Sequence, residues 1–413
     1  MTVLLAETAQ FDLFAAAAEP HDRLDRLLRD PRTRGERIER ELWTSRQRQG
    51  NSLHEVSYRA CFKPQLPHFF IARLTQPGER VFDPFSGRGT TAIEAALLGR
   101  RIAANDINPL SEILTRPRVA PPRIDEIRER LSAIDFQADA AVDEDDPDLS
   151  PFYHPETEQQ IRALRHYLAE RQRTGSEDAV DRWIRMVATN RLTGHSPGFF
   201  SVYTLPPNQA TTPERQREIN LKRGQAPEKR DVAAIILKKS AQLLSGLSEA
   251  QRQKMVALAI DAWFSTGRAQ NLAAVPDGSI ALTVTSPPFL DVVQYAEDNW
   301  LRCWFNCIDA QAVGRQMSVS RSLSVWSEEM AATLRELYRV TRQGGHVAFE
   351  VGEVRGGQVK LDEVIAPLGQ AAGFAVKAVL INQQRFTKTA NIWGVANNRK
   401  GTNTNRIVLF IKE

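Results

Sequence analysis

The chain has 413 residues, of which 42% are hydrophobic and 25% are charged, as in soluble globular proteins with a sizeable core. Its three cysteines are too few for a disulfide framework, and no apolar run reaches the roughly 18 residues that a transmembrane helix requires. The formal net charge of +4 is compatible with a polyanionic partner but does not demand one, so composition leaves the function open.

The first 50 residues are rich in charge. Residues 22–48 hold many arginines among acids and few large apolar side chains. The pattern predicts a helical N-terminal arm, which either follows a phosphate backbone or forms a solvated pair of helices. No signal-peptide pattern is present, so we expect a cytosolic protein.

Residues 80–91 form the first stretch with chemical character. A short apolar strand ends at Asp83, Gly87 and Gly89 make a tight turn, and Thr90 opens an Ala-rich helix. Glycines allow a ligand to approach the backbone closely, and the helix N-terminus adds polar contacts. A helix is expected to begin near Pro67, just before this stretch.

A second strand follows over residues 101–105 and ends at Asp106. An acid at this place in a βαβ unit can hydrogen-bond a nucleoside ribose. The turn lacks a third glycine and a Gly-Lys-Ser/Thr sequence, so pyrophosphate binding is poorly supported. A carboxylate at the turn suits a cationic or amino-bearing ligand such as S-adenosylmethionine.

Residues 116–264 interrupt the alternation of strands and helices. Helical patterns cover 124–136, 155–171, 177–191 and 232–264, and 137–148 is an acidic loop. Residues 193–230 have little regular pattern, and carry aromatic rings followed by basic side chains. This long loop either clamps nucleic acid or is a surface excursion with a few anchoring rings, and we favour binding. The candidate contacts are Phe199, Tyr203, Arg215, Arg217, Lys222 and Arg223.

The second informative stretch covers residues 282–289. A buried β-branched strand stops at Ser286, Pro287, Pro288 and Phe289. Each proline lacks an N–H and fixes φ, so the nearby carbonyls are held outside the sheet ladder beside a flat ring. Acceptors beside a stacking face suit a planar amine, whereas the simpler interpretation is a Pro-Pro strand terminator with a core ring.

The remaining sequence alternates again. Helices are expected over 297–305, 328–340 and 361–372, and strands over 346–351, 374–382 and 406–411. This alternation predicts an α/β fold with a doubly wound, mostly parallel sheet and a large, mainly helical insertion. Cys303 and Cys307 have helical spacing among aromatic residues, so we expect core thiols and no metal site.

Taken together, the two stretches resemble the amino-group DNA methyltransferases, which methylate exocyclic amines of bases. Residues 83–91 are similar to the family's cofactor loop and 285–289 to its catalytic tetrapeptide, whose form with Ser first is most typical of the cytosine-N4 branch. Lys63 and Pro64 resemble the cofactor-binding segment, and 337–345 resembles the helix and turn before a later strand. The resemblance covers about 50–115 and 270–413.

The resemblance implies a Rossmann-like fold that binds S-adenosylmethionine, and it assigns roles to individual residues. The catalytic set is Ser286, Pro287, Pro288, Phe289 and Asp291, where Asp291 is either a proton acceptor or a solvated turn carboxylate. The cofactor-binding set is Lys63, Pro64, Asp83, Pro84, Phe85, Ser86, Gly87, Gly89, Thr90, Asp106 and Asn108. The chain departs from the family at 267–270, where Gly, Arg, Ala and Gln stand in place of an acid before the catalytic strand.

The implied organisation has three parts. These are the arm (1–50), a catalytic domain (51–115 and 265–413) and the insertion (116–264), which is the candidate for target recognition. The implied activity is methylation of the N4 amine of a cytosine flipped out of double-stranded DNA. Adenine-N6 methylation is the close alternative, and an RNA-base methyltransferase or a non-catalytic nucleic-acid-binding protein is further removed.

The resemblance also carries expectations about the setting of the protein. A prokaryotic, nucleoid-associated location in the cytoplasm and a restriction endonuclease as partner fit such an activity. No membrane association is expected.

Overall fold

The computed structural model describes residues 28, 30, 33–40, 50–58, 62–139, 146–204, 211–288, 295–317, 322–355, 357–383 and 404–413. The strands are β1 (Glu36–Arg40), β2 (Arg80–Asp83), β3 (Arg101–Asp106), β4 (Trp263–Thr266), β5 (Ile280–Thr285), β6 (Thr341–Val351), β7 (Glu353–Val354), β8 (Val359–Lys360), β9 (Ala375–Gln383) and β10 (Thr404–Ile411). In this part of the chain no helix has the length and apolar character needed to span a membrane.

The helices are labelled in chain order in the same way as the strands. They are η3 (Ser52–His54), α2 (Gln65–Leu74), α3 (Thr90–Leu97), α4 (Leu110–Val119), α5 (Ile124–Ala133), α6 (Pro155–Arg173), α7 (Ala179–Arg191), α8 (Pro213–Arg223), α9 (Val232–Leu244), α10 (Glu249–Ala259), α11 (Tyr295–Phe305), α12 (Ala310–Gln316), α13 (Leu323–Val340) and α14 (Leu361–Ala371).

An eight-stranded sheet forms the centre of the molecule, in the order β1-β9-β10-β6-β5-β2-β3-β4. All neighbouring strands pair in parallel except β10, which runs antiparallel to both β6 and β9. The predicted α/β fold with a mostly parallel, doubly wound sheet is therefore confirmed.

The strand order contains a topological switch between β2 and β5. From β2 the chain moves outward to β3 and, after the helices of the insertion, to β4. It then returns to β5 on the other side of β2 and moves outward to β6. In open α/β sheets, ligands bind outside the carboxyl ends of the strands at such a switch. The two stretches singled out in the sequence end β2 and β5, so they meet at this crevice.

Helices cover both faces of the sheet because successive strand residues point to opposite sides. Val81 and Leu282 pack on one face with residues of α2 and α3, whereas Phe82 and Phe349 pack on the other with residues of α13 and α14. Every residue of β5 is buried. The crevice thus sits on a rigid, fully packed core.

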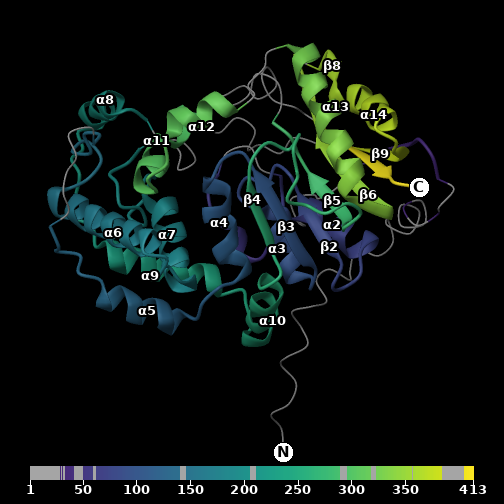
Figure 1. Cartoon of the computed structure of the whole chain (residues 1–413). Coiled ribbons are helices and arrows are strands. Elements are labelled where there is room, and N and C mark those ends of the chain that lie inside the picture. The colour runs from purple at the N-terminus through teal and green to yellow at the C-terminus, as the bar shows by residue number, and fades with distance from the viewer. Residues whose placement is uncertain are drawn as a thin grey trace, which may run out of the picture.

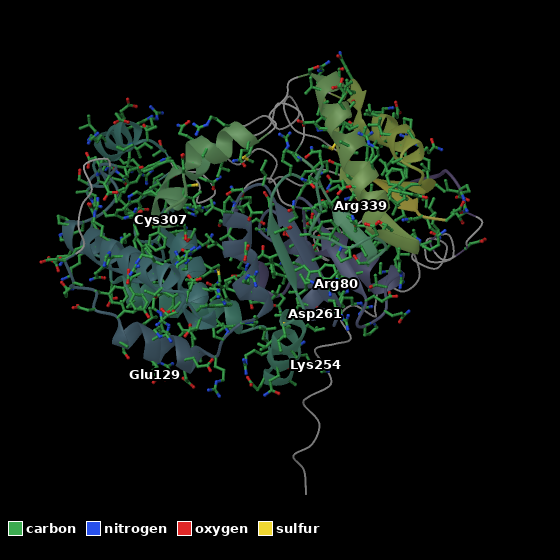
Figure 2. The ribbon with its side chains drawn as sticks, viewed as in Figure 1. Arg80, Glu129, Lys254, Asp261, Cys307 and Arg339 are labelled. Atoms are coloured by element: carbon green, nitrogen blue, oxygen red, sulfur yellow. The ribbon has the colours of Figure 1, made fainter. Side chains whose placement is uncertain are left out.

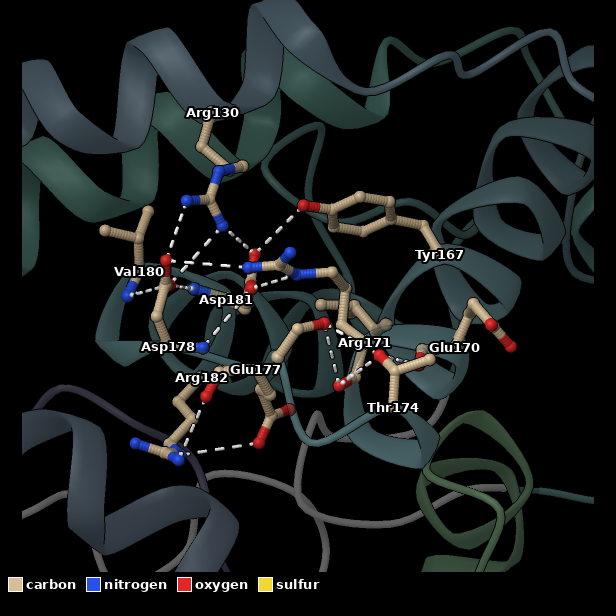
Figure 3. Close-up of polar contacts among 12 residues, drawn as sticks. Arg130, Tyr167, Glu170, Arg171, Thr174, Glu177, Asp178, Val180, Asp181 and Arg182 are labelled. Atoms are coloured by element: carbon tan, nitrogen blue, oxygen red, sulfur yellow. Dashed lines mark hydrogen bonds and ion pairs between the residues drawn. The ribbon is translucent and has the colours of Figure 1, made fainter.

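The insertion forms a helical lobe beside the sheet, on the left in Figure 1, where α5, α6, α7 and α9 lie together. Asp181 at the start of α7 is fully buried and accepts hydrogen bonds from Arg130 of α5, from Arg171 of α6 (2.8 Å) and from the Tyr167 hydroxyl (3.2 Å) (Figure 3). A buried carboxylate needs such partners. The cluster therefore joins three helices of the lobe to one another.

Two predicted features of the insertion are wrong. Residues 193–230 were expected to be irregular, but α8 lies within them and residues 194–204 form a closed loop, in which Thr204 N donates to Gly194 O. Residues 263 and 264 were assigned to a helix of the insertion, yet they begin β4, an edge strand paired with β3. Helix α8 was not predicted because Gln216 is its single buried residue, so its sequence carries no apolar stripe.

Arg80 ties β4 to the sheet (Figure 2). Its guanidinium forms a 2.7 Å ion pair with Asp261, donates to the Ile102 carbonyl at 3.0 Å and lies 3.5 Å from the centre of the Trp263 ring. Arg80 is buried, and this set of partners compensates its charge.

Two further predictions need correction. The N-terminal 50 residues are not entirely helical, because Glu36–Arg40 forms β1 and pairs with β9 at the sheet edge. Of the two expected core thiols, Cys303 is buried, but Cys307 is exposed just beyond α11 (Figure 2). Residues 1–27, 29, 31, 32 and 41–49 of the N-terminal arm, and Cys61, lie outside the described residues.

Candidate active site

The loop between β2 and α3 is shaped by two glycines with positive φ. Gly87 has φ +53° and Gly89 has φ +77°, a left-handed conformation that favours glycine. A Cβ on Gly89 would lie 2.3 Å from Thr115 of α4, so the close packing of the loop on α4 also demands glycine. Helix α3 begins directly afterwards at Thr90, which is buried like Ser86.

Asp83, at the end of β2, is fully buried between the two loops of the crevice. Its Oδ1 accepts hydrogen bonds from the Thr285 hydroxyl (2.6 Å) and from the Phe85 amide (3.1 Å). Its Oδ2 has no partner, since the nearby Thr91 hydroxyl donates its one proton to the Val284 carbonyl. Burial raises the pKa of Asp83 to about 7.

Asp106 ends β3 and closes the loop from the other side. Its Oδ2 accepts from the Gly87 amide (2.8 Å) and its Oδ1 accepts from the Asn108 amide (2.9 Å). Burial raises the pKa of this carboxyl to about 6. Each carboxylate oxygen has two lone pairs, so Asp106 can still accept from ligand hydroxyls.

The remaining residues of the cofactor-binding set surround this loop. Asn105 fixes its backbone by donating to the Pro84 carbonyl (3.1 Å). The buried Asn108 donates to the Tyr58 hydroxyl (3.3 Å), and its side-chain Oδ1 accepts from the Leu110 amide at the start of α4 (3.0 Å). Pro64 precedes α2, which packs against α3. Phe85 is half-buried beside the sheet.

The stretch after β5 emerges next to Asp83. Ser286 is half-buried and Pro287 is buried. The Pro288 carbonyl accepts a 2.9 Å hydrogen bond from the indole N–H of Trp326 in α13. This bond fixes the path of the chain as it leaves the sheet. Phe289 and Asp291, the last two members of the catalytic set, lie outside the described residues.

Glu350 is a site residue that sequence reasoning missed. It lies at the carboxyl end of β6, is 4% exposed, and its Oε1 accepts a 2.5 Å hydrogen bond from the Asn405 side-chain amide. Burial raises the pKa of this carboxyl to about 7, against smaller lowering effects of Asn405, of the neighbouring Ser286 side chain and of the Lys63 charge. An acid inside the apolar run of 346–351 was the available signal.

The candidate DNA contacts in the insertion are divided between packed and exposed positions. Phe199 is buried against Gly194 and lies under the Arg191 guanidinium, which is 4.0 Å from the ring centre. Tyr203 is half-buried, and the Arg223 guanidinium lies 3.9 Å from its ring centre. The Phe199 ring is therefore placed for packing, whereas Tyr203 and Arg223 form a surface pair.

The exposed basic residues of α8 differ in their partners. Arg215 pairs with Glu218, and Arg217 pairs with Asp148. Lys222 is exposed at the end of the helix, next to Arg223. The carboxylates offset much of the positive charge of the first turns of α8, so the C-terminal end is its more basic part.

S-adenosylmethionine has an ammonium, a sulfonium and a ribose, and the site offers matching groups. Asp83 Oδ2 and Ser86 Oγ are buried without a partner, and such orphaned atoms call for one. Asp106 retains acceptor capacity for hydroxyls. The glycine loop leaves its backbone open to close approach. The residues present therefore fit this cofactor.

Comparison with known proteins agrees with this geometry. The family model for DNA methylases of the N6 and N4 type matches residues 11–113. A Type II methyltransferase, M.MvaI from Kocuria varians, is 31% identical over 83 residues, which are 19% of this chain and 18% of that protein. Over these segments the chain is similar to the amino-group DNA methyltransferases, and it spans less than a fifth of the length of this relative. The expectation of S-adenosylmethionine agrees with this family, whereas the match does not separate the N4 and N6 branches.

Solved structures give weaker likenesses. A DNA modification methylase from Thermus thermophilus, complexed with S-adenosyl-L-methionine, is 21% identical over 35% of this chain and 51% of its own, with a TM-score of 0.23. The rRNA methyltransferase aviRa from Streptomyces viridochromogenes is 14% identical over 88% of this chain and 90% of its own, with a TM-score of 0.33. We draw no conclusion from likenesses at this level.

Proposed function

We propose that the protein is a DNA methyltransferase that transfers a methyl group from S-adenosylmethionine to the exocyclic N4 amine of a cytosine. The observation that carries the proposal is the junction at the switch point, where Asp83 of the glycine loop and Thr285 of the catalytic strand are joined by a 2.6 Å hydrogen bond. One loop suits the cofactor and the other suits an amine, and the bond holds them side by side.

The cofactor loop would bind its ligand by charge and by shape. Asp106 would accept hydrogen bonds from the ribose, while Asp83 and Ser86 would receive the amino acid end. When bound, S-adenosylmethionine would supply a methyl group on a positively charged sulfur, which keeps the electron pair of the carbon–sulfur bond as nitrogen bonds the carbon. Lys63 and Pro64 border the site from the segment before α2.

The strand end after β5 would bind the amine. The nitrogen of cytosine N4 is conjugated with the ring and is a poor nucleophile. Hydrogen bonds from this amine to Ser286 and to the Pro287 carbonyl would favour tetrahedral geometry and free its lone pair. The Pro288 carbonyl accepts a hydrogen bond from Trp326, which fixes the chain just beyond these two residues.

The target base must leave the duplex to reach this crevice, at a cost of a few kcal/mol. Phe289 would offset part of the cost by stacking, worth about 1–3 kcal/mol per base. The insertion would contact the surrounding DNA, with Lys222 and Arg223 at the basic end of α8 and Tyr203 beside them.

Ser286 supports cytosine over adenine, because the form of the tetrapeptide that begins with Ser is most typical of the N4 branch. Adenine-N6 methylation is the alternative. A cognate restriction endonuclease, and a cytoplasmic, nucleoid-associated location, stay predictions.

The experiment is direct identification of the product. The protein is incubated with unmethylated double-stranded DNA and S-adenosylmethionine carrying a labelled methyl group, and the nucleosides are then separated by mass spectrometry. Labelled N4-methylcytosine is expected. Labelled N6-methyladenine alone would establish the alternative. Absence of any labelled base, with no binding of the cofactor by calorimetry, would point to a non-catalytic protein.

A further inference from the structure

Arg191, the last residue of α7, carries a buried positive charge that no carboxylate in the described part of the chain balances. The residue is 8% exposed. Its Nε donates to the Asn190 carbonyl (3.1 Å) and its Nη2 donates to the Asn190 side-chain oxygen (2.6 Å), and both acceptors are neutral. Removing a charge from water is costly unless an opposite charge lies close to it. The position therefore calls for an anion from outside the chain.

Two other buried arginines of the helical lobe have the carboxylate partner that Arg191 lacks. Arg185, on the same helix, forms a 2.7 Å ion pair with Glu177. Arg162 of α6 forms a 2.5 Å ion pair with Asp146. These two guanidiniums have a sufficient structural explanation, whereas the charge of Arg191 does not.

The charges that act on Arg191 are positive. Burial, and then the charge of Arg302 in α11, lower the pKa of Arg191 to about 10, so the guanidinium stays protonated at neutral pH. Arg191 in turn repels the buried Lys239 of α9, which pairs with Glu55 at 3.4 Å. A bound anion would offset this repulsion.

Hydrogen bonds join Arg191 and Arg302 to one backbone carbonyl beside the crevice. Asn190, which holds Arg191, donates from Nδ2 to the Ser57 carbonyl (3.1 Å), and Arg302 donates from Nη2 to the same oxygen (3.2 Å). The hydroxyl of the next residue, Tyr58, accepts from the asparagine at the start of α4, beside the cofactor loop. The two guanidiniums thus lie where the insertion, α11 and the cofactor side of the crevice meet.

Phe199 keeps the guanidinium of Arg191 in one plane. The buried ring has its centre 4.0 Å from the guanidinium carbon. The two bonds to Asn190 use Nε and Nη2, which leaves Nη1 to donate to a ligand. A planar, preorganised guanidinium matches the oxygens of a phosphate group. Phe199, a DNA contact in the sequence-based prediction, would then act through Arg191.

We propose that Arg191 binds a phosphate of the DNA backbone beside the crevice, and that Asn190 and Phe199 hold its guanidinium for this contact. The inference rests on the proposed function, since the ligand is the DNA that carries the target base. The strand from which a base turns out must pass next to the crevice that receives the base. A phosphate contact positions the DNA without reading its sequence.

The first test measures the stability of the free protein by urea unfolding. Arg191→Met removes the charge but keeps an unbranched side chain that can lie on the Phe199 ring. Because Arg191 lacks a counter-charge until DNA binds, the variant should unfold at the same urea concentration as the wild type or at a higher one. Arg185→Met breaks the pair with Glu177 and should unfold at a lower concentration. An equal loss of stability in both variants would overturn the proposal, since Arg191 would then be a structural residue.

The second test measures affinity for a short duplex of mixed sequence by fluorescence anisotropy between about 50 and 200 mM salt. Arg191→Met should bind at least about tenfold more weakly at the lowest salt, and its slope of log affinity against log salt should be smaller by about 1. Arg182→Met is the control on the same helix, at a side chain that is 42% exposed and pairs with Glu177 at 3.4 Å, and should keep both values. A wild-type slope in Arg191→Met would contradict the phosphate contact.

Inorganic phosphate distinguishes a DNA site from a site for a free anion. Compared with chloride at equal ionic strength, phosphate should raise the urea midpoints of the wild type and of Arg191→Met alike. A larger increase in the wild type, together with equal DNA affinity of the two proteins, would overturn the assignment to DNA.

The binding experiment needs no methylation, so the inference and the proposed function can fail separately. A wild type that methylates no base, but whose salt slope depends on Arg191, would remove the function and leave the phosphate site. A methylating wild type with an unchanged slope in Arg191→Met would do the reverse.

Discussion

The hydroxyl of Thr285 donates a 2.6 Å hydrogen bond to the carboxylate of Asp83, across 202 residues of sequence. This bond joins the end of β5 to the end of β2 at the switch point of the sheet. Both residues are fully buried, so water cannot replace the bond if it is lost. The relative placement of the two loops depends on it.

Thr285→Val should therefore destabilise the protein by about 1–3 kcal/mol, the cost of leaving a buried acceptor short of a donor. Thr283→Val on the same strand is the matched control, because the Thr283 hydroxyl is buried without a partner and its removal should be neutral or stabilising. Urea unfolding measures both. Equal losses of unfolding free energy in the two variants would mean that the hydrogen bond to Asp83 does not stabilise the protein specifically.

Gly89→Ala should abolish tight cofactor binding, since its Cβ would meet Thr115 at 2.3 Å in a backbone conformation with φ +77°. Gly99→Ala provides the comparison, for Gly99 has φ +76° and no atom within 4 Å of an added Cβ. Left-handed strain alone costs about 1–2 kcal/mol. Calorimetry should show a loss of affinity of tenfold or more for Gly89→Ala alone, and a similar loss in both variants would exclude the clash as its cause.

Asp106→Ala should weaken cofactor binding more than the rate of methyl transfer at saturating cofactor. Phe289→Ala should do the reverse, because the ring is expected to stack on the base. The dissociation constant of the cofactor and the single-turnover rate, measured for both variants, test this division. A loss of cofactor affinity that is the same in both would contradict the roles assigned to them.

Stability should depend on pH through Asp83. Its pKa is raised from 3.8 to about 7, so between these values the folded state holds a proton that the unfolded state has lost. Stability contributed by this group is thus lost as pH rises from about 4 to 7, by roughly 4 kcal/mol at most. The difference between wild type and Asp83→Asn in urea unfolding should show this slope, and Asp125→Asn, at a side chain that is 79% exposed, should not remove it.

DNA binding should depend more on the end of α8 than on its first turns. Lys222→Ala and Arg223→Ala should each weaken binding and lower the salt slope by about 1 if the side chain contacts a phosphate. Arg215→Ala should have a smaller effect, because Arg215 already pairs with Glu218. Fluorescence anisotropy between about 50 and 200 mM salt, the range over which such slopes are clear, measures this. Equal effects of all three would contradict the distinction.

Much of the fold could be predicted from sequence, because the apolar strands and amphipathic helices of the sheet carry clear periodic patterns. Strands that lack such a pattern were missed. Glu36–Arg40 contains a single apolar residue, Ile38, as is common in edge strands protected by charge. Trp263–Thr266 has only four residues and begins shortly after α10, which ends at Ala259.

The two loops of the site were also found from sequence, because a glycine turn and a Pro-Pro stop each mark a strand end locally. Their partners were not. The bonds of Asp83 to Thr285 and of Glu350 to Asn405 depend on strand order and register, which bring together residues far apart in the chain. No local pattern encodes such a pairing.

The most direct test of the account is the identity of the methylated base in cells. DNA from a methylation-deficient host that expresses the wild-type chain should contain N4-methylcytosine by nucleoside mass spectrometry, and DNA from cells with Ser286→Ala should contain at least tenfold less at equal protein level. N6-methyladenine as the sole new base would contradict the assignment to cytosine. An unchanged N4-methylcytosine content with Ser286→Ala would contradict the proposed site.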